Sequence, residues 1–434
     1  MALSLQKHNV EKLFIYFLLL QPALDVLAYV NIPLSSVLRG LLVGAGIGYI
    51  FFFLPDKQGR KSALIYLVIL GIFMTMHLVN NYMVKESFSI PVELTYIIKT
   101  VFFIVMLLVY VFVIPSFSKQ KYWQKVIQSA VLINMTFIAV IMLLATVTGS
   151  GYRSYGALAK EGHSGWFFSG NELSVILGMG FSITILYMLQ KQSTRTKMLL
   201  LPVIGLIIWA MLMIGTKVSF GSVLIVLGIS ISVFILKAIH NSKNWFNLGV
   251  LTVLLAAAIA IAPITPIGNN LDLTFGTNIA KQEKSPADVD ADGKKQAAQQ
   301  LLSGRKDFLK EKNKQYQEAP VSQKLLGMGF GGNYTFAPKL IEMDFLDWYF
   351  NFGWIGFILL LLPLLYIGYR ILIKLCKYHL KSLNVPIILT GVSVALGIGS
   401  AFTAGHVLSS PAASIYLAVF IGYLFALVQN EASP

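Results

Sequence analysis

The chain has 434 residues, of which 56% are hydrophobic and 12% are charged. A soluble protein of this length could not bury so much apolar surface, and repeated apolar runs of about 20 residues indicate α-helices that cross a membrane. The formal net charge of +15 is therefore interpreted as topology information and contact with anionic lipid, and nucleic acid is excluded as a partner. The single cysteine, Cys376, excludes a disulfide framework and a cysteine metal site.

The apolar runs predict an all-α multi-pass membrane protein with about twelve membrane-spanning helices. The expected spans are residues 11–30, 33–54, 62–80, 92–115, 126–147, 167–189, 198–214, 218–238, 247–265, 345–370, 386–407 and 410–429. The first run has the basic flank of a signal peptide but lacks a small-residue cleavage site, so it is interpreted as a retained span. The sequence contains no visible internal repeat, which gives no support for the paired halves of many transporters.

Lysine and arginine gather in the loops on one side of the predicted bundle. They lie within residues 57–61, 119–125, 191–197, 237–243 and 370–381, whereas the short loops of opposite parity carry few. Because basic loops stay in the cytoplasm, we expect both termini to be cytoplasmic and the long polar segment to lie outside. The expected parts are residues 1–264 with nine spans, the external segment 265–341 with an amphipathic helix, and residues 342–434 with three spans.

The first half of the external segment is charged and rich in alanine. Within it, residues 288–293 resemble the start of a calcium loop. The twelfth position is Gln299 rather than the bidentate glutamate that such a loop needs, and an acidic solvated turn is the alternative interpretation.

The second half of the segment has a helical pattern. Ser303 is a residue type that favours an N-cap, and Phe308, Leu309 and Tyr316 follow at helical spacing among charges, which predicts an amphipathic helix against the membrane surface. The glycines within residues 327–332 form a turn whose N–H groups could approach an anion, although no strand precedes it.

Ionisable side chains at membrane depth are costly and indicate functional sites. In the predicted topology they fall in the outer half of the spans: Asp25, Arg39, Glu93, Lys99, Glu172, Lys217, Asp344 and Asp347, with His77, His163 and His406 near the outer boundary. This segregation predicts one polar site that opens outward. Alternatives remain for single residues, since Lys217 could extend its ammonium to the interface and the acidic residues before the tenth span could complement its positive end. Histidines in such places are more often satisfied polar groups than catalysts.

Several short motifs carry a resemblance to a known family. They are residues 20–25, 165–172, 215–217, 303–305, 326–330 and 342–356. Together they resemble the O-antigen ligase and polymerase superfamily of bacterial membrane glycosyltransferases, in which a polar residue after the large external loop precedes a helix carrying Gly-x-x-Gly. Glu342 stands where the ligases usually have histidine, and Lys217 where they usually have arginine. These departures resemble the variants encoded with Gram-positive capsule and cell-wall polysaccharide genes.

The resemblance implies a glycosyltransferase without a metal or other cofactor, in the bacterial cytoplasmic membrane with its active site on the outer face. It would move a glycan from an undecaprenyl-diphosphate-linked donor to a hydroxyl of a glycan or wall-polymer acceptor. The catalytic candidates are Glu342 as the general base, Asp344 as the alternative base, and Arg305 as a bidentate partner of the departing diphosphate. The expected substrate-binding residues are Lys217, Arg39, Lys99, Asp347, Asn171 and Glu172.

Two other classes of function fit part of the pattern. A flippase or exporter of lipid-linked saccharides would also have many spans and buried charges, but it would not need a long structured external segment. A structural scaffold would leave the one-sided cluster of ionisable residues without a purpose. The acceptor, the sugars and the choice between polymerase and ligase are not encoded in any recognisable motif.

Overall fold

A computed structural model describes residues 2–32, 34–54, 56–118, 122–156, 160–279, 305–334, 338–377 and 384–431. The regular secondary structure within these ranges is helical, with one isolated β-bridge between Arg153 and His163, and loops connect the helices. The calcium-like segment 288–299 and Ser303 lie outside the described residues.

The first half of the chain forms α1 (Ala2–Tyr29), α2 (Leu34–Phe52), α3 (Lys57–Val84), α4 (Ile90–Phe117), α5 (Trp123–Thr148) and α6 (Gly170–Leu189). It continues with α7 (Thr194–Met213), α8 (Lys217–His240), η1 (Ser242–Asn244), α9 (Trp245–Ile261), η2 (Ala262–Ile264) and α10 (Pro266–Ile279). The last part forms α12 (Arg305–Glu318), α13 (Val321–Leu326), α14 (Asp344–Lys377), α15 (Val385–Thr403) and α16 (Pro411–Glu431).

In the described part of the chain, eleven helices are long and apolar enough to cross a membrane. They correspond to the second through the twelfth predicted spans, which confirms the multi-pass helical fold class. The helix α1 covers the first predicted span and packs along α5 and α2, but it is not among these eleven.

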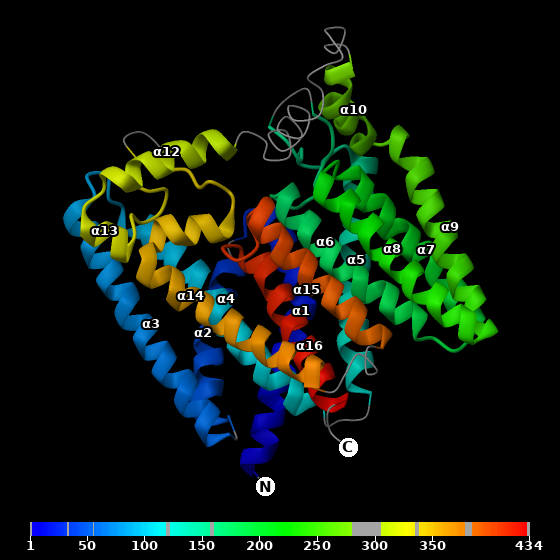
Figure 1. Ribbon diagram of the computed structural model, residues 1–434, viewed down its shortest axis with the longest axis horizontal. Coiled ribbons are helices and arrows are strands. Elements are labelled where there is room, and N and C mark those ends of the chain that lie inside the picture. The colour runs from blue at the N-terminus through cyan, green and yellow to red at the C-terminus, as the bar shows by residue number, and fades with distance from the viewer. Residues whose placement is uncertain are drawn as a thin grey trace.

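The centre of the bundle is formed by α4, α6 and α16, whose side chains are mostly buried. Within it α16 packs along α4, and α15 packs along α6 (Figure 1). Several polar side chains in this core are paired across helices; for example, the hydroxyl of Tyr110 donates to the carbonyl of Phe14 at 2.9 Å. Such pairing is favourable because an unpaired polar group inside a membrane protein is costly.

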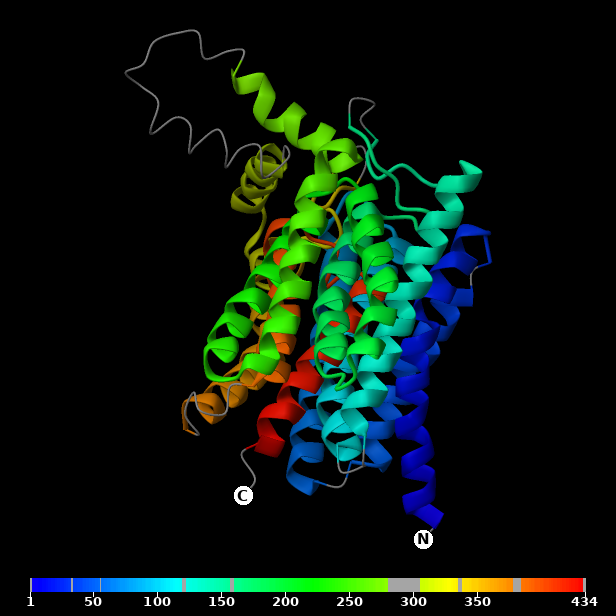
Figure 2. The ribbon, with the colours of Figure 1, turned by 90° about the vertical axis from the view of Figure 1, so that its right-hand side faces the viewer.

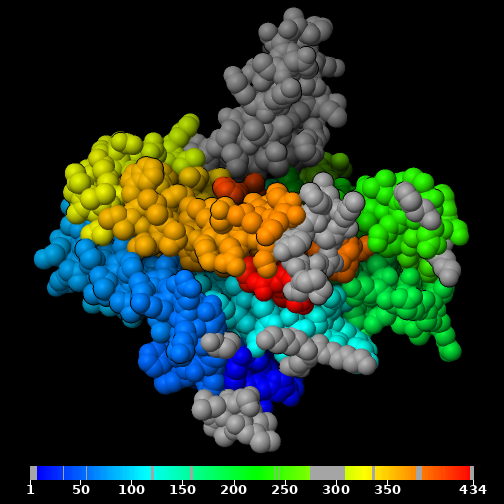
Figure 3. Space-filling view, turned by 60° about the horizontal axis from the view of Figure 1, so that its bottom comes forward, coloured from blue at the N-terminus to red at the C-terminus, as the bar shows by residue number. Residues whose placement is uncertain are grey.

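The short helices α10, α12 and α13 gather at one end of the bundle, and both termini lie at the other end (Figures 1 and 2). This is the arrangement predicted from the parity of the spans. At the surface α14 lies beside α12 and α13 (Figure 3). The side that carries α12 and α13 is called the cap end below.

The helix α14 consists of two helices joined at Gly353, whose backbone is left-handed and non-helical with φ 66° and ψ −174°. This break leaves the carbonyls of Phe350 and Asn351 without helical partners. The N–H groups of Met328 and Gly329 take their place at 3.0 Å each. The break is therefore compensated by the glycine-rich loop that packs against it.

Candidate functional site

Two residues at the cap end, Glu342 and His406, have strained backbone. Glu342 lies just before α14, and His406 lies just after α15. Glu342 has φ 66° and His406 has φ 57°, in the left-handed region that side chains other than glycine rarely adopt. The Nε2 atom of His406 lies 3.7 Å from the Oε1 atom of Glu342, and both side chains are about one-third exposed, at 29% and 35%. Strain of this kind costs about 1–3 kcal/mol and concentrates at functional sites.

The charge of His406 follows from its neighbours. Burial lowers its pKa, but the hydrogen bond to Glu342 and the charges of Glu172, Glu342 and Asp344 outweigh burial and raise the pKa above its ordinary value. The imidazole is therefore held toward its protonated form beside a carboxylate. In such a pair Glu342 can accept a proton while His406 supplies a positive charge.

The two aspartates at the start of α14 hold the backbone of this pair. The carboxylate of Asp347 accepts from the N–H groups of Ile341 at 2.8 Å, Glu342 at 3.0 Å and Met343 at 3.2 Å. The carboxylate of Asp344 accepts from the N–H groups of the residues after His406 and from a serine hydroxyl: Val407 at 2.8 Å, Leu408 at 2.9 Å and Ser409 at 2.9 Å.

Both carboxylates are buried, at 1% exposure for Asp344 and 3% for Asp347. Their hydrogen bonds all go to the protein segments that carry Glu342 and His406. Asp344 and Asp347 therefore support the backbone on either side of the pair, and Glu342 is the more exposed of the three carboxylates. Gly405 completes this support, since a Cβ atom there would lie 2.4 Å from the backbone of Glu342.

Three further candidates, Arg39, Asp25 and Glu172, lie on other helices, and Glu172 connects them electrostatically to His406. The Nη2 atom of Arg39 on α2 contacts Asp25 of α1 at 2.7 Å and Gln21 at 3.0 Å. The carboxylate of Glu172 interacts with Ser410 through a hydrogen bond and lies within electrostatic range of His406, Asp25 and Arg39. The structure thus brings α1, α2, α6 and the start of α14 together with the α15–α16 loop around one polar centre.

The N-termini of α6 and α8 lie side by side next to this centre. The hydroxyl of Ser174 contacts the hydroxyl of Thr216, the N-cap of α8, at 2.5 Å. Asn171 and Glu172 occupy the first turn of α6, and Lys217 is the first residue of α8. Two helix N-termini and a lysine provide positive potential for an anion.

Two candidates receive less support from their placement. Lys99 is exposed on α4, and no contact among the described residues joins it to the polar centre. Arg305 begins α12 at the cap end, as the predicted helix start requires, and its side chain lies outside the described part. The role of both in binding an anion stays a prediction.

The glycine-rich turn within residues 327–332 is not an open anion cradle. The N–H groups of Gly327, Met328, Gly329, Phe330 and Gly332 all donate to protein acceptors. The expectation that they could approach a phosphate is therefore wrong. The physical reason is the broken α14, whose free carbonyls compete for two of these donors.

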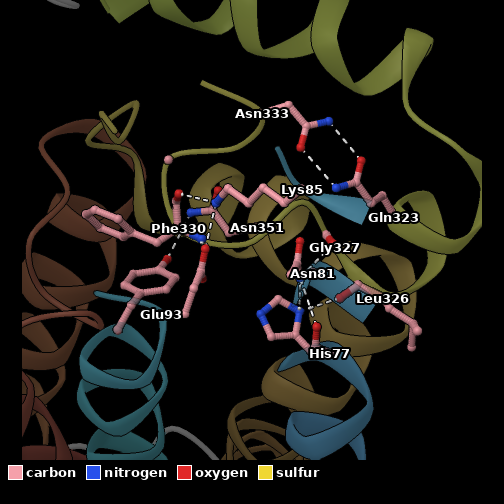
Figure 4. A network of polar contacts seen from close by, with 12 residues as sticks. His77, Asn81, Lys85, Glu93, Gln323, Leu326, Gly327, Phe330, Asn333 and Asn351 are labelled. Carbon is pink, nitrogen blue, oxygen red and sulfur yellow. Dashed lines mark hydrogen bonds and ion pairs between the residues drawn. The ribbon is translucent and has the colours of Figure 1, made fainter. Parts of the chain in front are cut away.

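A second polar network fixes this turn to α3 and α4 (Figure 4). The Nζ atom of Lys85 lies 2.6 Å from Glu93 and 2.9 Å from the carbonyl of Phe330, whose N–H donates to Glu93 at 2.7 Å. His77 donates to the carbonyl of Leu326 at 2.6 Å. The alternative interpretation of His77, a satisfied buried polar group, fits Nδ1, whereas Nε2 is buried without a hydrogen-bond partner among the described residues.

Sequence reasoning missed two lysines of this region, Lys85 and Lys312. Lys312 donates to the carbonyl of Gly331, and burial lowers its pKa to about 8 although the charge of Asp347 opposes the shift. Neither lysine lies within a predicted span core, so hydropathy gave no signal. In the residues that the structure describes, no group of three or more metal-ligating side chains could hold an ion.

A protein-family model matches nearly the whole chain. Residues 7–431 match the family model described as O-antigen ligase like membrane protein. A comparison with curated proteins finds no match. The match extends over nearly all of the helical bundle, including the polar centre at the cap end. The chain therefore belongs to the O-antigen ligase-like membrane protein family.

Proposed function

We propose that this membrane protein of glycan ligation or polymerisation transfers a glycan from an undecaprenyl-diphosphate-linked donor to a sugar hydroxyl. The acceptor is a second glycan or a wall polymer, and the reaction takes place at the outer face of the bacterial cytoplasmic membrane. The observation that carries this proposal is the Glu342–His406 pair, held in strained backbone by two buried aspartates at the cap end.

The chemistry requires a base and a place for negative charge. Glu342 takes the proton of the acceptor hydroxyl while the hydroxyl oxygen forms a bond to the anomeric carbon of the donor. The bond between that carbon and the diphosphate oxygen breaks, and the electron pair leaves with the lipid diphosphate. Protonated His406 keeps the carboxylate of Glu342 charged before the reaction and compensates the change in charge during it.

The departing diphosphate needs cations. Lys217 lies at the paired N-termini of α6 and α8, and Arg39 lies within electrostatic range of Glu172 in the same centre. Arg305 is proposed to add a bidentate contact from the start of α12, since a guanidinium matches the geometry of a phosphate. These side chains would supply the positive charge that a metal ion supplies in other transferases.

The test uses purified protein in detergent with a matching lipid-linked oligosaccharide, no nucleotide sugar and a chelator. We expect glycan transfer and release of the lipid diphosphate. Glu342→Gln should lower the rate by about 10²- to 10⁴-fold, and Arg305→Lys should nearly abolish transfer. Asp272→Asn, an exposed carboxylate of α10, is the matched control and should keep the wild-type rate.

The same assay separates the alternatives. Export without release of lipid diphosphate would favour a flippase. Strict dependence on a divalent metal would contradict the account in which side chains replace the ion. A Glu342→Gln protein with more than about a tenth of the wild-type rate would reject Glu342 as the base.

A further inference from the structure

A cavity of about 300 Å³ opens at the cap end between the end of α3, helices α12 and α13, and the segment after the glycine-rich turn. It is called the α3–α13 pocket here. Its polar wall is formed by Ser87, Gln315, Glu318, Gln323, Asn333 and Tyr334. None of these residues belongs to the Glu342–His406 centre. The volume is at the lower end of the range for small-ligand pockets.

One wall of the pocket is rigid. Gln323 is fully buried, and its amide exchanges two hydrogen bonds with the amide of Asn333, at 2.9 and 2.8 Å (Figure 4). Behind it the ammonium of Lys85 is held by Glu93 and by the carbonyl of Phe330. Because that ammonium is already paired, the lysine does not make the pocket an anion site.

Acceptors without a hydrogen-bond partner contribute to the pocket lining, beside amide and hydroxyl groups that can also donate. The Oε1 atom of Gln315 is buried and has no hydrogen-bond partner among the described residues. Glu86 and Glu318 contribute exposed carboxylates to the lining, and no ion pair within the described ranges neutralises them. A buried acceptor without a partner is costly, so it indicates a donor that a ligand would supply.

We infer that the α3–α13 pocket binds an uncharged saccharide segment of the glycan that the enzyme elongates or transfers. Sugar hydroxyls are donors that match the two exposed carboxylates, and they match Gln315 once its side chain turns into the pocket. The half-buried ring of Tyr334 has the Lys85 ammonium 4.9 Å from its centroid, and its remaining surface offers a contact for the apolar side of a pyranose. The carboxylates disfavour acidic sugars, since like charges repel at close range. The identity of the ligand rests on the proposed function, whereas the binding test below does not require turnover.

The pocket is close enough to the polar centre for one glycan to occupy both. Glu342 follows Tyr334 by eight residues, and a chain of that length spans at most about 28 Å. Lys312, one helical turn before Gln315, also interacts electrostatically with Asp347. If one end of a glycan lies at Glu342, sugars a few units along the same glycan would therefore reach the pocket.

The experiment measures binding to the full-length protein in nanodiscs by titration calorimetry. The probe is a lipid-free short oligosaccharide released from the surface polysaccharide of the producing cell, with any uronic acid carboxyl groups reduced. Gln315→Ala should weaken binding about fivefold to tenfold by removing one acceptor, and Ser87→Trp should abolish binding by filling the cavity. Gln317→Ala, two residues away on the exposed side of α12, is the matched control.

Transfer to a single-repeat acceptor should stay at the wild-type rate in both pocket variants, which also shows that they fold. The inference is overturned if the wild-type protein does not bind the probe, or if Gln315→Ala and Ser87→Trp bind it as the control does. The two proposals fail separately. Loss of probe binding in the variants of a protein without transferase activity would support the pocket and reject the proposed function.

Discussion

The replacement Asp347→Asn tests whether Asp347 holds the base in place. Its carboxylate accepts three backbone N–H groups, and Oδ1 alone serves Ile341, which is 1% exposed. An asparagine keeps one oxygen, so the best orientation retains the contacts to Glu342 and Met343 and leaves the N–H of Ile341 unpaired. A buried donor without a partner costs about 1–3 kcal/mol.

The free energy lost with this hydrogen bond is about as large as the backbone strain at Glu342 that the bond helps to offset. A left-handed residue such as Glu342 costs about 1–2 kcal/mol, so the weakened support allows the backbone at Glu342 to relax. A displacement of about 1 Å at a catalytic group lowers a rate by about 10²-fold. We therefore expect kcat to fall by about 10- to 100-fold while KM stays nearly unchanged, because Asp347 contacts only protein.

The assay is steady-state transfer with the lipid-linked donor, together with thermal unfolding of the same preparation. Asp56→Asn is the matched control, since Asp56 also caps backbone N–H groups but lies at the N-terminus of α3, at the opposite end of the bundle. Asparagine is nearly as good an N-cap as aspartate, so this variant should behave as wild type. An Asp347→Asn enzyme with kcat within about twofold of wild type would refute the positioning role.

Three further predictions concern the fold, the pH dependence and the topology. Gly353→Ala should lower the melting temperature, because its Cβ atom would lie 2.6 Å from the N atom of the loop glycine that packs there and its φ is 66°. Gly368→Ala on the same helix meets nothing within 4 Å and should be neutral or stabilising; equal melting temperatures would contradict the role of the break. The raised pKa of His406 means that its contribution to stability is present below the ordinary histidine pKa and is lost as pH rises through the folded pKa. Thermal unfolding between pH 6 and 9 should therefore show a decline that His406→Gln removes, and an unchanged decline in the variant would reject the ion pair. In a background without the native cysteine, Lys314→Cys on α12 should react with an impermeant thiol reagent in intact cells, and Lys57→Cys at the other end should react only after lysis. The reverse labelling would invert the topology.

The sequence alone determined the helical bundle and the side on which its polar residues gather. Apolar runs of membrane length are local features, and a membrane requires each of them to satisfy its own backbone hydrogen bonds, so spans are readable without tertiary information. For the same reason the one-sided placement of Asp25, Arg39, Glu172 and Asp344 was visible from span parity. The helix that begins at Arg305 followed from the helical spacing of Phe308, Leu309 and Tyr316.

Only the tertiary structure decided what each carboxylate does. Nothing in the local sequence distinguishes Glu342, which faces His406, from Asp344 and Asp347, which hold backbone N–H groups. Those partners come from the α15–α16 loop and from the turn before α14, and a side chain's type does not record which distant donors surround it. The broken helix at Gly353 likewise turned the glycine-rich segment into a docked loop, because its N–H groups pair with carbonyls that only the break makes available.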